Sequence, residues 1–245
     1  MAHLYRLLLL TWLSCFWPAA AASSLTVGVA ANFKATLEQL IVAHQASHPG
    51  LEIRLSVAST GTLYAQIVSG APFDLMFAAD SERPTQLYQQ GLSDRPYTYA
   101  LGRLVLVSRI PGVSNLNDLR NFGGKIAIAN PVTAPYGAAA EAILRSLDTE
   151  RQWPLVKGNN IAQAYQFYHS GNVQVGLIAA SLLTPAERSR AFPIPDQLHQ
   201  PIRQQAVVLK GPNTVLAAAF LDFVISPAGK DIILATGYDV ERARP

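Results

Sequence analysis

Apolar, strand-like runs alternate with segments of helical periodicity along the chain from residue 25 onward. Leu25–Ala30 has the composition of a buried strand, and apolar residues from Phe33 to His44 then recur at helical spacing. Repeated alternation predicts an α/β protein with mostly parallel sheets that are flanked by helices. The predicted strands are 25–30, 53–57, 74–79, 103–107, 125–129, 173–179 and 205–209, and the predicted helices are 33–44, 63–68, 80–91, 136–147, 160–169, 181–190 and 214–226.

Four of the strand-to-helix junctions are built mostly from small, uncharged residues that can form hydrogen bonds. A helix N-terminus offers unpaired N–H groups and the positive end of the helix dipole, and both attract anions. Each helix end carries roughly half a positive charge, so four of them match a dianion such as a tetrahedral oxyanion. If the junctions converge, the protein can hold an anion with neutral donors. The four junctions are 30–33, 58–62, 130–137 and 157–161.

The helical pattern lapses longest in two stretches. One is 93–101, and the other is the proline-containing stretch 192–203. We interpret both stretches as crossings between two lobes, which would leave the C-terminal helices packed on the first lobe. The predicted organisation is a hinged clamp, with residues 23–102 and 204–245 in lobe 1 and residues 103–203 in lobe 2.

The first 22 residues have the pattern of a secretory signal peptide. Arg6 precedes an apolar run over 7–17, and the small residues that follow provide a signal peptidase site, with cleavage predicted after Ala22 or Ala21. The run is shorter than the roughly 18 apolar residues that a membrane-spanning helix needs. We therefore expect an exported protein without a membrane anchor.

Cys15 is the only cysteine of the chain. A lipoprotein signal at this cysteine is a poor match, because the bulky Trp12 and Phe16 lie close to it and the alanine cluster follows. After cleavage the exported chain would have no thiol, no disulfide and no cysteine-based metal site. Its stability would then depend on burial of its core alone.

The charge of the chain does not predict a nucleic-acid-binding surface. The calculated pI is 9.1, but without Arg6 the chain keeps 18 of its 19 Lys and Arg residues against 16 Asp and Glu residues, a formal charge of +2. The basic residues are scattered and do not interleave with aromatic residues. We therefore expect no nucleic-acid partner.

The sequence contains none of the common catalytic signatures. A Gly-x-Ser-x-Gly elbow, a phosphate-binding P-loop, a dinucleotide fingerprint and a His-Glu-x-x-His motif are all absent. Ser59 has no assigned base, and a serine without a base is not activated as a nucleophile. His44, His48, His169 and His199 do not have metal-ligand spacing. We predict a non-enzyme without cofactor or protein-metal ligands, and a secreted hydrolase is the disfavoured alternative.

Four sequence blocks resemble the periplasmic molybdate-binding proteins of ABC importers. The most specific is Gly-Ala-Pro-Phe-Asp-Leu, which begins at Gly70 and leads to the Ala-Ala-Asp that ends at Asp80. The other blocks are 29–33, 58–67 and 130–137. The resemblance extends over essentially the whole chain after the signal peptide.

The resemblance implies a two-lobe type II periplasmic binding protein. Such a protein closes on molybdate or tungstate between its lobes and delivers the anion to an ABC permease in the inner membrane. Molybdenum would enter only as the bound oxyanion, without a direct bond to the protein. We expect a periplasmic monomer.

The resemblance also implies which residues contact the anion. Members of the family use backbone N–H groups and hydroxyl or amide side chains, without a cationic partner. Many relatives have Ser at the position of Asn32, where an Asn amide can also donate. Carried over position by position, the contact residues are Ala31, Asn32, Ser59, Thr60, Tyr136 and Ile161, the last through its backbone N–H.

One donor of the family pattern is absent from this chain. Other relatives supply a Tyr hydroxyl from the strand near residues 178–180, where this chain has Ala179. Tyr136 is a candidate replacement, either through its hydroxyl or through its backbone N–H.

The junction residues leave alternatives open. Asn32, Ser59 and Thr60 belong to the residue types that cap helices, so each has a purely structural interpretation. A receptor of the same fold for sulfate is the nearest functional alternative, because sulfate is also a fully ionised tetrahedral dianion. Phosphate fits less well, since its protonated form needs an acceptor and the four junctions contain no Asp or Glu.

Overall fold

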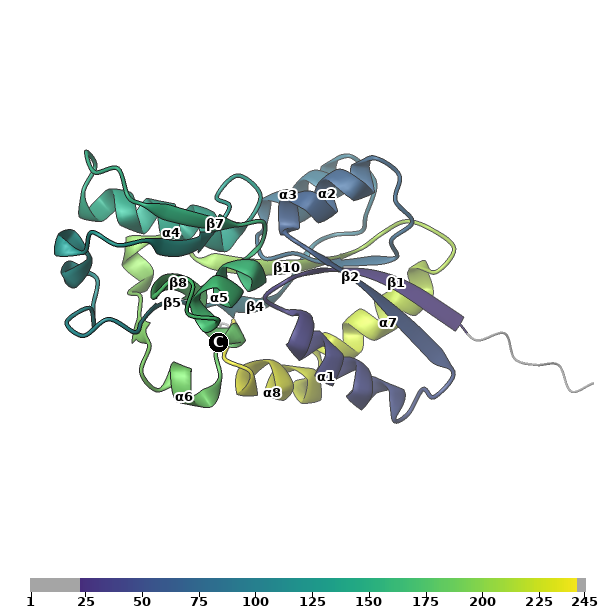
Figure 1. The fold of residues 1–245 in the computed structure, drawn as a ribbon. Coiled ribbons are helices and arrows are strands. Elements are labelled where there is room, and N and C mark those ends of the chain that lie inside the picture. Colours follow the sequence, from purple (N-terminus) through teal and green to yellow (C-terminus); the bar gives the residue numbers. More distant parts are fainter. Residues whose placement is uncertain (1–22, 242–245) are drawn as a thin grey trace, which may run out of the picture.

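The computed structural model describes residues 23–241, which form two lobes that lie side by side (Figure 1). Each lobe is built around one five-stranded sheet. The predicted signal peptide, residues 1–22, lies outside the described residues. The strands of lobe 1 are β1 (Ser23–Ala30), β2 (Leu51–Ala58), β3 (Leu75–Phe77), β4 (Tyr97–Gly102) and β10 (Ile202–Val208). The strands of lobe 2 are β5 (Leu104–Ser108), β6 (Ile126–Ala129), β7 (Leu155–Gly158), β8 (Val175–Ala179) and β9 (Phe192–Pro193).

The two sheets have the same pattern of strand directions. In the order β2-β1-β3-β10-β4, the first three strands are parallel, and β10 is antiparallel to both of its neighbours. In the order β7-β6-β8-β5-β9, the first three strands are again parallel, and β5 is antiparallel to both neighbours. Four of the five strands in each sheet therefore run in one direction, and the sheets are mixed.

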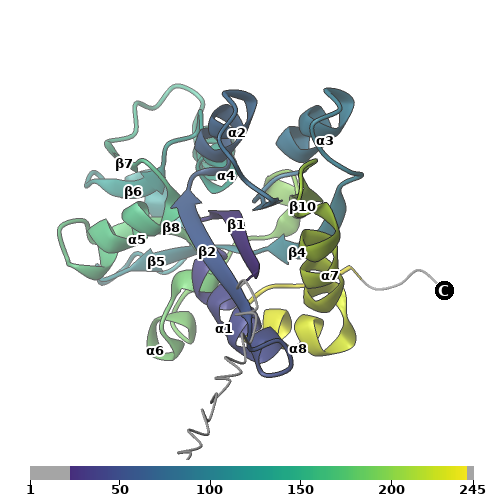
Figure 2. The same ribbon diagram turned by 90° about the vertical axis from the view of Figure 1, so that its right-hand side faces the viewer.

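Helices cover both faces of the lobe 1 sheet. Figures 1 and 2 show α2 and α3 on one face and α1, α7 and α8 on the other. The α-helices are α1 (Lys34–Gln45), α2 (Thr60–Val68), α3 (Glu82–Gln89), α4 (Pro135–Leu147), α5 (Ile161–His169), α6 (Pro185–Arg188), α7 (Thr214–Ile225) and α8 (Pro227–Ala235). Short 3-10 helices occupy η1 (Asn117–Asn121), η2 (Ala180–Leu182) and η3 (Asp196–Leu198). No helix among residues 23–241 is both long and apolar enough to cross a membrane.

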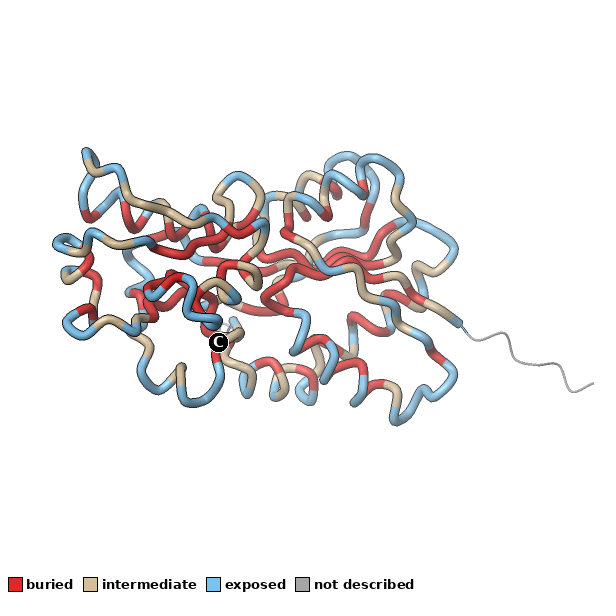
Figure 3. The backbone as a smooth tube through the Cα atoms, viewed as in Figure 1, coloured by how far each residue is buried: buried red, intermediate tan, exposed pale blue. Residues whose placement is uncertain are grey.

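The core of lobe 1 has two layers, one on each side of its sheet. Leu75 and Phe77 of β3 pack in the layer under α1, α7 and α8, whereas Met76 between them packs in the layer under α2 and α3. This alternation follows from the two-residue period of a strand. Figure 3 shows that the central strands are buried along their length, while the outer helix faces are exposed.

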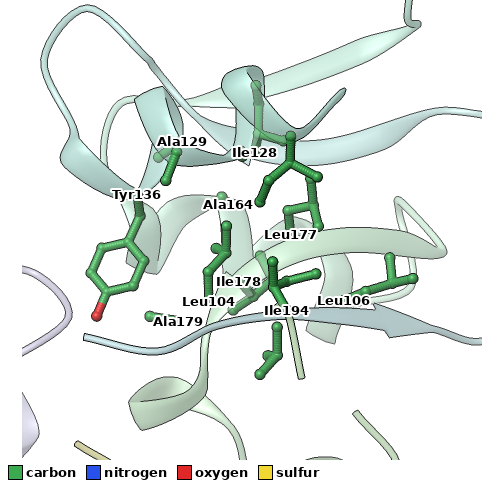
Figure 4. Packing of buried hydrophobic residues seen from close by; sticks show 14 of the residues in the cluster. Leu104, Leu106, Ile128, Ala129, Tyr136, Ala164, Leu177, Ile178, Ala179 and Ile194 are labelled. Carbon is green, nitrogen blue, oxygen red and sulfur yellow. The ribbon is translucent and has the colours of Figure 1, made fainter. Parts of the chain in front are cut away.

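The core of lobe 2 is continuous with the end of lobe 1. Leu106, Ile128 and Leu177 form part of its centre (Figure 4), and the same cluster includes Ala30 and Ala79 at strand ends of lobe 1. The two lobes therefore pack directly against each other where their strands end.

The chain changes from one sheet to the other in two places. The first change occurs between Gly102, which ends β4, and Leu104, which begins β5, and the second lies between β9 and β10. The C-terminal segment contacts the chain beside both crossings: Asp239 pairs with Arg103, and Glu241 pairs with Arg203.

Several elements differ from the sequence-based expectation. The stretch predicted to be a crossing at 93–101 contains β4, and β7 was not among the predicted strands. The helix predicted over 181–190 is only the four-residue α6, which begins at Pro185 with a capping box from Thr184. These elements are short or only partly buried, so their sequences lack a strong periodic signal.

Gly137 permits the close approach of α4 to β6. A Cβ atom at this position would collide with the backbone of Ala129 and Asn130. Only glycine fits this contact. The contact also fixes the position of the neighbouring Tyr136, whose side chain projects from the first turn of α4.

We expect acid to destabilise the protein through His44. His44 is buried against Phe220 and Phe223 of α7, and its Nδ1 has no hydrogen-bond partner. Burial, and then the charge of the stacked His48, lower the pKa of His44 below its ordinary value of 6.5. The unfolded chain therefore binds the proton more readily, and stability falls as the pH drops below about 6.5, by about 1.4 kcal/mol per unit of pKa shift.

Chemical denaturation at pH 7.5 and pH 5 measures this effect. In the variant His44→Phe, which keeps an aromatic ring at the site but cannot titrate, the difference in unfolding free energy between the two pH values should shrink. An undiminished difference in the variant would assign the acid sensitivity to other groups.

Candidate functional site

The sheet pairing places two of the predicted junctions side by side in each lobe. Ala30 and Ala58 are register partners at the carboxyl ends of the parallel strands β1 and β2. Ala129 and Gly158 occupy the equivalent positions at the ends of β6 and β7. Ligands of such sheets bind at this edge, because the helices that follow the strands begin there.

Backbone hydrogen bonds then connect all four junctions in series. The N–H of Ala31 donates to the carbonyl of Ala58 at 3.0 Å within lobe 1, and the N–H of Asn130 donates to the carbonyl of Gly158 at 2.7 Å within lobe 2. Between the lobes, the N–H of Gly61 donates to the carbonyl of Thr133 at 2.9 Å. The four junctions therefore meet at the boundary between the lobes.

The six predicted contact residues are all buried at this boundary. Each has no more than 4% of its surface exposed. Within residues 23–241, no group accepts a hydrogen bond from the backbone N–H of Asn32, Ser59, Thr60, Tyr136 or Ile161. Buried N–H groups without acceptors are costly unless a ligand or water pairs with them.

Ala31 differs from the other five residues. Its N–H is already bonded to Ala58, so it holds the turn in place and has no free donor.

The side chains of Ser59 and Thr60 have structural partners. Ser59 is the N-cap of α2, and its hydroxyl lies 2.7 Å from that of Thr62. The hydroxyl of Thr60 accepts a hydrogen bond from the N–H of Ala79 at 2.9 Å, which links α2 to the end of β3. The capping interpretation is therefore correct for the Ser59 side chain, while both backbone N–H groups remain without acceptors.

Asn32 does not cap α1. The N-cap of this helix is Phe33, and no side chain caps it. The Asn32 amide nitrogen instead donates to Gln204 Oε1 at 2.9 Å and to the Tyr238 hydroxyl at 3.0 Å. Its backbone carbonyl accepts hydrogen bonds from Tyr238 and from Ser181 of lobe 2.

Tyr136 reaches from lobe 2 toward lobe 1. Figure 4 shows its ring leaving the apolar cluster with the hydroxyl outermost, and this hydroxyl accepts a hydrogen bond from Gln204 Nε2 at 3.0 Å. Burial raises the pKa of Tyr136 well above its ordinary value of 10. The hydroxyl therefore keeps its proton, which remains available for donation.

Ile161 is the first residue of α5, directly after the N-cap Asn160, whose side chain accepts from the N–H of Gln163. The position gives Ile161 an N–H that no earlier turn of the helix can satisfy.

Three residues of this arrangement were missed by sequence reasoning. They are Gln204 on β10, Tyr99 on β4 and Tyr238 near the C-terminus, all nearly or completely buried. Gln204 directly precedes the predicted strand 205–209, and a polar residue beside an apolar strand is the only local signal in the sequence. The hydrogen-bond partners of these three residues lie far away in sequence.

The charged side chains near the junctions are paired or exposed. Lys34 pairs with Glu38 on α1, and Lys157 is exposed. Arg83 pairs with Asp80, whose carboxylate also accepts from the backbone N–H of Arg83 at the start of α3. Neutral groups therefore dominate the boundary.

The boundary offers buried N–H groups of the kind that can bind an anion. The Ser59 hydroxyl contacts Thr62 rather than a base, and no group of three or more His, Cys, Asp or Glu residues within 23–241 could hold a metal ion.

The chain is similar to known solute-binding proteins. Residues 25–239 match the family described as bacterial extracellular solute-binding protein. The chain is 38% identical to the molybdate-binding protein ModA of Azotobacter vinelandii, over 91% of this chain and 92% of that protein. It is 37% identical to the molybdate-binding protein ModA of Rhodobacter capsulatus, over 91% and 90% of the two chains.

A solved structure shares the fold over the same range. The periplasmic molybdate-binding protein of Azotobacter vinelandii superimposes with a TM-score of 0.81 at 34% identity, covering 89% of this chain and all of that one. The chain therefore belongs to the bacterial extracellular solute-binding proteins, which are transport components rather than enzymes, and is a homologue of the molybdate-binding proteins.

Proposed function

We propose that this protein captures molybdate, and tungstate with it, outside the cytoplasm and delivers the anion to an ABC permease in the inner membrane. One observation carries the proposal: five backbone N–H groups without acceptors, from both lobes, lie at the meeting point of the four junctions. The names of the molybdate-binding relatives support the identity of the anion.

Neutral donors can supply the affinity that a receptor needs. Hydrogen bonds to a charged group contribute roughly 1.5–3 kcal/mol each, so the five N–H groups and the Asn32 amide together would supply on the order of 9–18 kcal/mol before ordering and closure costs. Nanomolar binding requires about 12 kcal/mol. Donors from both lobes are needed to reach that total.

The proposed contact residues are Asn32, Ser59, Thr60, Tyr136 and Ile161, with Ala31 supporting the first turn. Sulfate is the alternative ligand, because the same N–H groups would donate to any tetrahedral dianion of suitable size. Protonated phosphate is disfavoured, since none of the four junctions contains a carboxylate that could accept its proton.

The proposal includes export and closure. Residues 1–22 would direct the chain to the periplasm and be removed, and the mature protein would act as a monomer. Residues 23–102 and 204–245 would move as lobe 1 against residues 103–203 as lobe 2. An anion that contacts both lobes binds the closed form better, and this difference drives closure.

The first prediction concerns the ligand. Molybdate and tungstate should raise the melting temperature of the mature protein by mass action on the native state, and sulfate and phosphate at the same concentration and ionic strength should raise it much less. Calorimetric titration with the four anions gives the affinities. Equal affinities for sulfate and molybdate would remove the molybdate assignment and leave the fold unaffected.

The second prediction concerns Asn32. Replacing it with alanine should weaken molybdate binding by roughly 1–3 kcal/mol, because a donor to a desolvated anion is lost. Asn213→Ala is a matched control: its amide bonds to Ser24 and Asp74, near the opposite end of β1 from Asn32. The control should lower stability without changing affinity, and a similar loss of affinity in both variants would contradict a direct role for Asn32.

The third prediction concerns closure. The lobes contact each other through Gly61 and Thr133 in this structure, so a ligand that favours this arrangement should compact the molecule. Small-angle scattering should give a smaller radius of gyration with saturating molybdate than without it. A constant radius despite tight binding would indicate a preformed pocket and not a clamp.

A further inference from the structure

Gln204 is a completely buried amide that connects the two lobes. It lies on β10, shortly after the second change between the sheets. Its Oε1 accepts from Asn32 Nδ2 and from the Tyr99 hydroxyl, both at 2.9 Å, and its Nε2 donates to the Tyr136 hydroxyl at 3.0 Å. One side chain therefore contacts a proposed anion-binding residue in each lobe.

The Asn32 amide has no hydrogen left for a ligand in this arrangement. Its two N–H bonds point to Gln204 and Tyr238. Its Oδ1 is buried and has no partner among residues 23–241. The position of Oδ1 is thus the only one from which the Asn32 side chain can contact a ligand, and an oxygen there cannot donate to an anion.

A rotation of the Asn32 and Gln204 side-chain amides by about 180° exchanges the positions of their oxygen and nitrogen atoms. It frees the Asn32 N–H groups without displacing any other residue. Gln204 Nε2 then donates to Asn32 Oδ1 and to Tyr99, and Gln204 Oε1 accepts from Tyr136. Tyr99 can still donate to the carbonyl of Ala78, as it does at 3.1 Å. The side-chain oxygens of Asn32 and Gln204 are then both satisfied, and the Tyr238 hydroxyl, which no longer accepts from Asn32, keeps its donation to the Asn32 carbonyl. The Asn32 nitrogen occupies the position without a partner.

We propose that Gln204 is the positioning residue of the oxyanion site: in the ligand-bound protein its amide donates to Asn32, accepts from Tyr136, and so turns the Asn32 nitrogen toward the anion. This inference rests on the proposed function. One amide serves both residues. In this orientation the N–H groups of the Asn32 side chain are free to donate to the anion, and the Tyr136 hydroxyl donates to Gln204. Tyr136 then contacts the anion through its backbone N–H.

The fold leaves space for this connection at the other change between the sheets. A Cβ atom at Gly102 would collide with the Tyr136 hydroxyl and with Gln204 Nε2. Gly102 ends β4, and Gln204 follows the start of β10. Residues next to both chain crossings therefore meet at the bond between Gln204 and Tyr136, which joins lobe 1 to lobe 2.

Calorimetric titration of two variants with molybdate tests the proposal. Gln204→Glu should bind at least about 30-fold more weakly, because a carboxylate only accepts. It can still accept from Tyr136, but it would keep the Asn32 nitrogen turned toward position 204 and away from the anion. Gln204→Met keeps the length of the side chain without adding charge, and should bind at least about 10-fold more weakly because Asn32 loses its orientation.

Gln205→Glu is the matched control. It adds the same charge at the next residue, whose side chain bonds to Thr98 and not to the site, and its affinity should stay within about threefold of the wild type. Melting curves without ligand separate loss of folding from loss of affinity. Equal loss in the Gln204→Glu and Gln205→Glu variants would mean that charge alone explains the effect and would overturn the proposal.

The side-chain amide resonances of ¹⁵N-labelled protein provide a readout that a general loss of packing would not move. In the wild type and in Gln205→Glu, the NH₂ signals of Asn32 and Gln204 should shift together as molybdate is added. This measurement needs no variant at position 204, so it tests the proposed role of Gln204 even if those variants fail to fold. Unshifted side-chain amides at saturation would overturn the inference.

The wild-type titration distinguishes the two proposals. A wild type that binds none of molybdate, tungstate, sulfate and phosphate removes the proposed function and this inference with it. A wild type that binds molybdate, with Gln204 variants of unchanged affinity, removes only the role of Gln204. If sulfate proves to be the preferred anion, the same variants titrated with sulfate decide the role of Gln204.

Discussion

Unpaired N–H groups at the starts of helices are the constraint on which the architecture of this protein depends. A helix that follows a parallel strand begins at the carboxyl edge of the sheet, and its first N–H groups have no partner within the helix. Pairing of Ala30 with Ala58, and of Ala129 with Gly158, sets two such starts side by side in each lobe. The bond between Gly61 and Thr133 then brings the two pairs together.

A site of this kind would bind an anion without a cationic side chain. The basic residues near the junctions are exposed or already paired with carboxylates, as Lys34 is with Glu38 and Arg83 with Asp80. Fixed N–H groups have defined positions, so they can distinguish anions by size and protonation state more sharply than a mobile lysine can. This is the physical basis for expecting selectivity among dianions of equal charge.

The lobes are joined by apolar packing, by the backbone bond between Gly61 and Thr133, and by the buried bond from Gln204 to Tyr136. Asn32, Tyr99, Tyr136 and Tyr238 all belong to the buried network around Gln204. Buried polar networks are costly when partly satisfied. Under the proposed function, a ligand that completes the network would contribute to closure as well as to binding.

The amino-acid sequence by itself determined the alternation of strands and helices and the types of residue at the four junctions, because periodicity and helix-start preferences are local properties. It predicted β1, β6 and α4 well and missed β4 and β7, which are short or only partly buried. Only the tertiary structure decided that Ala31 has no free N–H, that Thr60 bonds to Ala79, and that Gln204 joins Asn32 to Tyr136. Their partners are separated by 19 to 172 residues, and no local pattern reports a contact that the packing of two lobes creates.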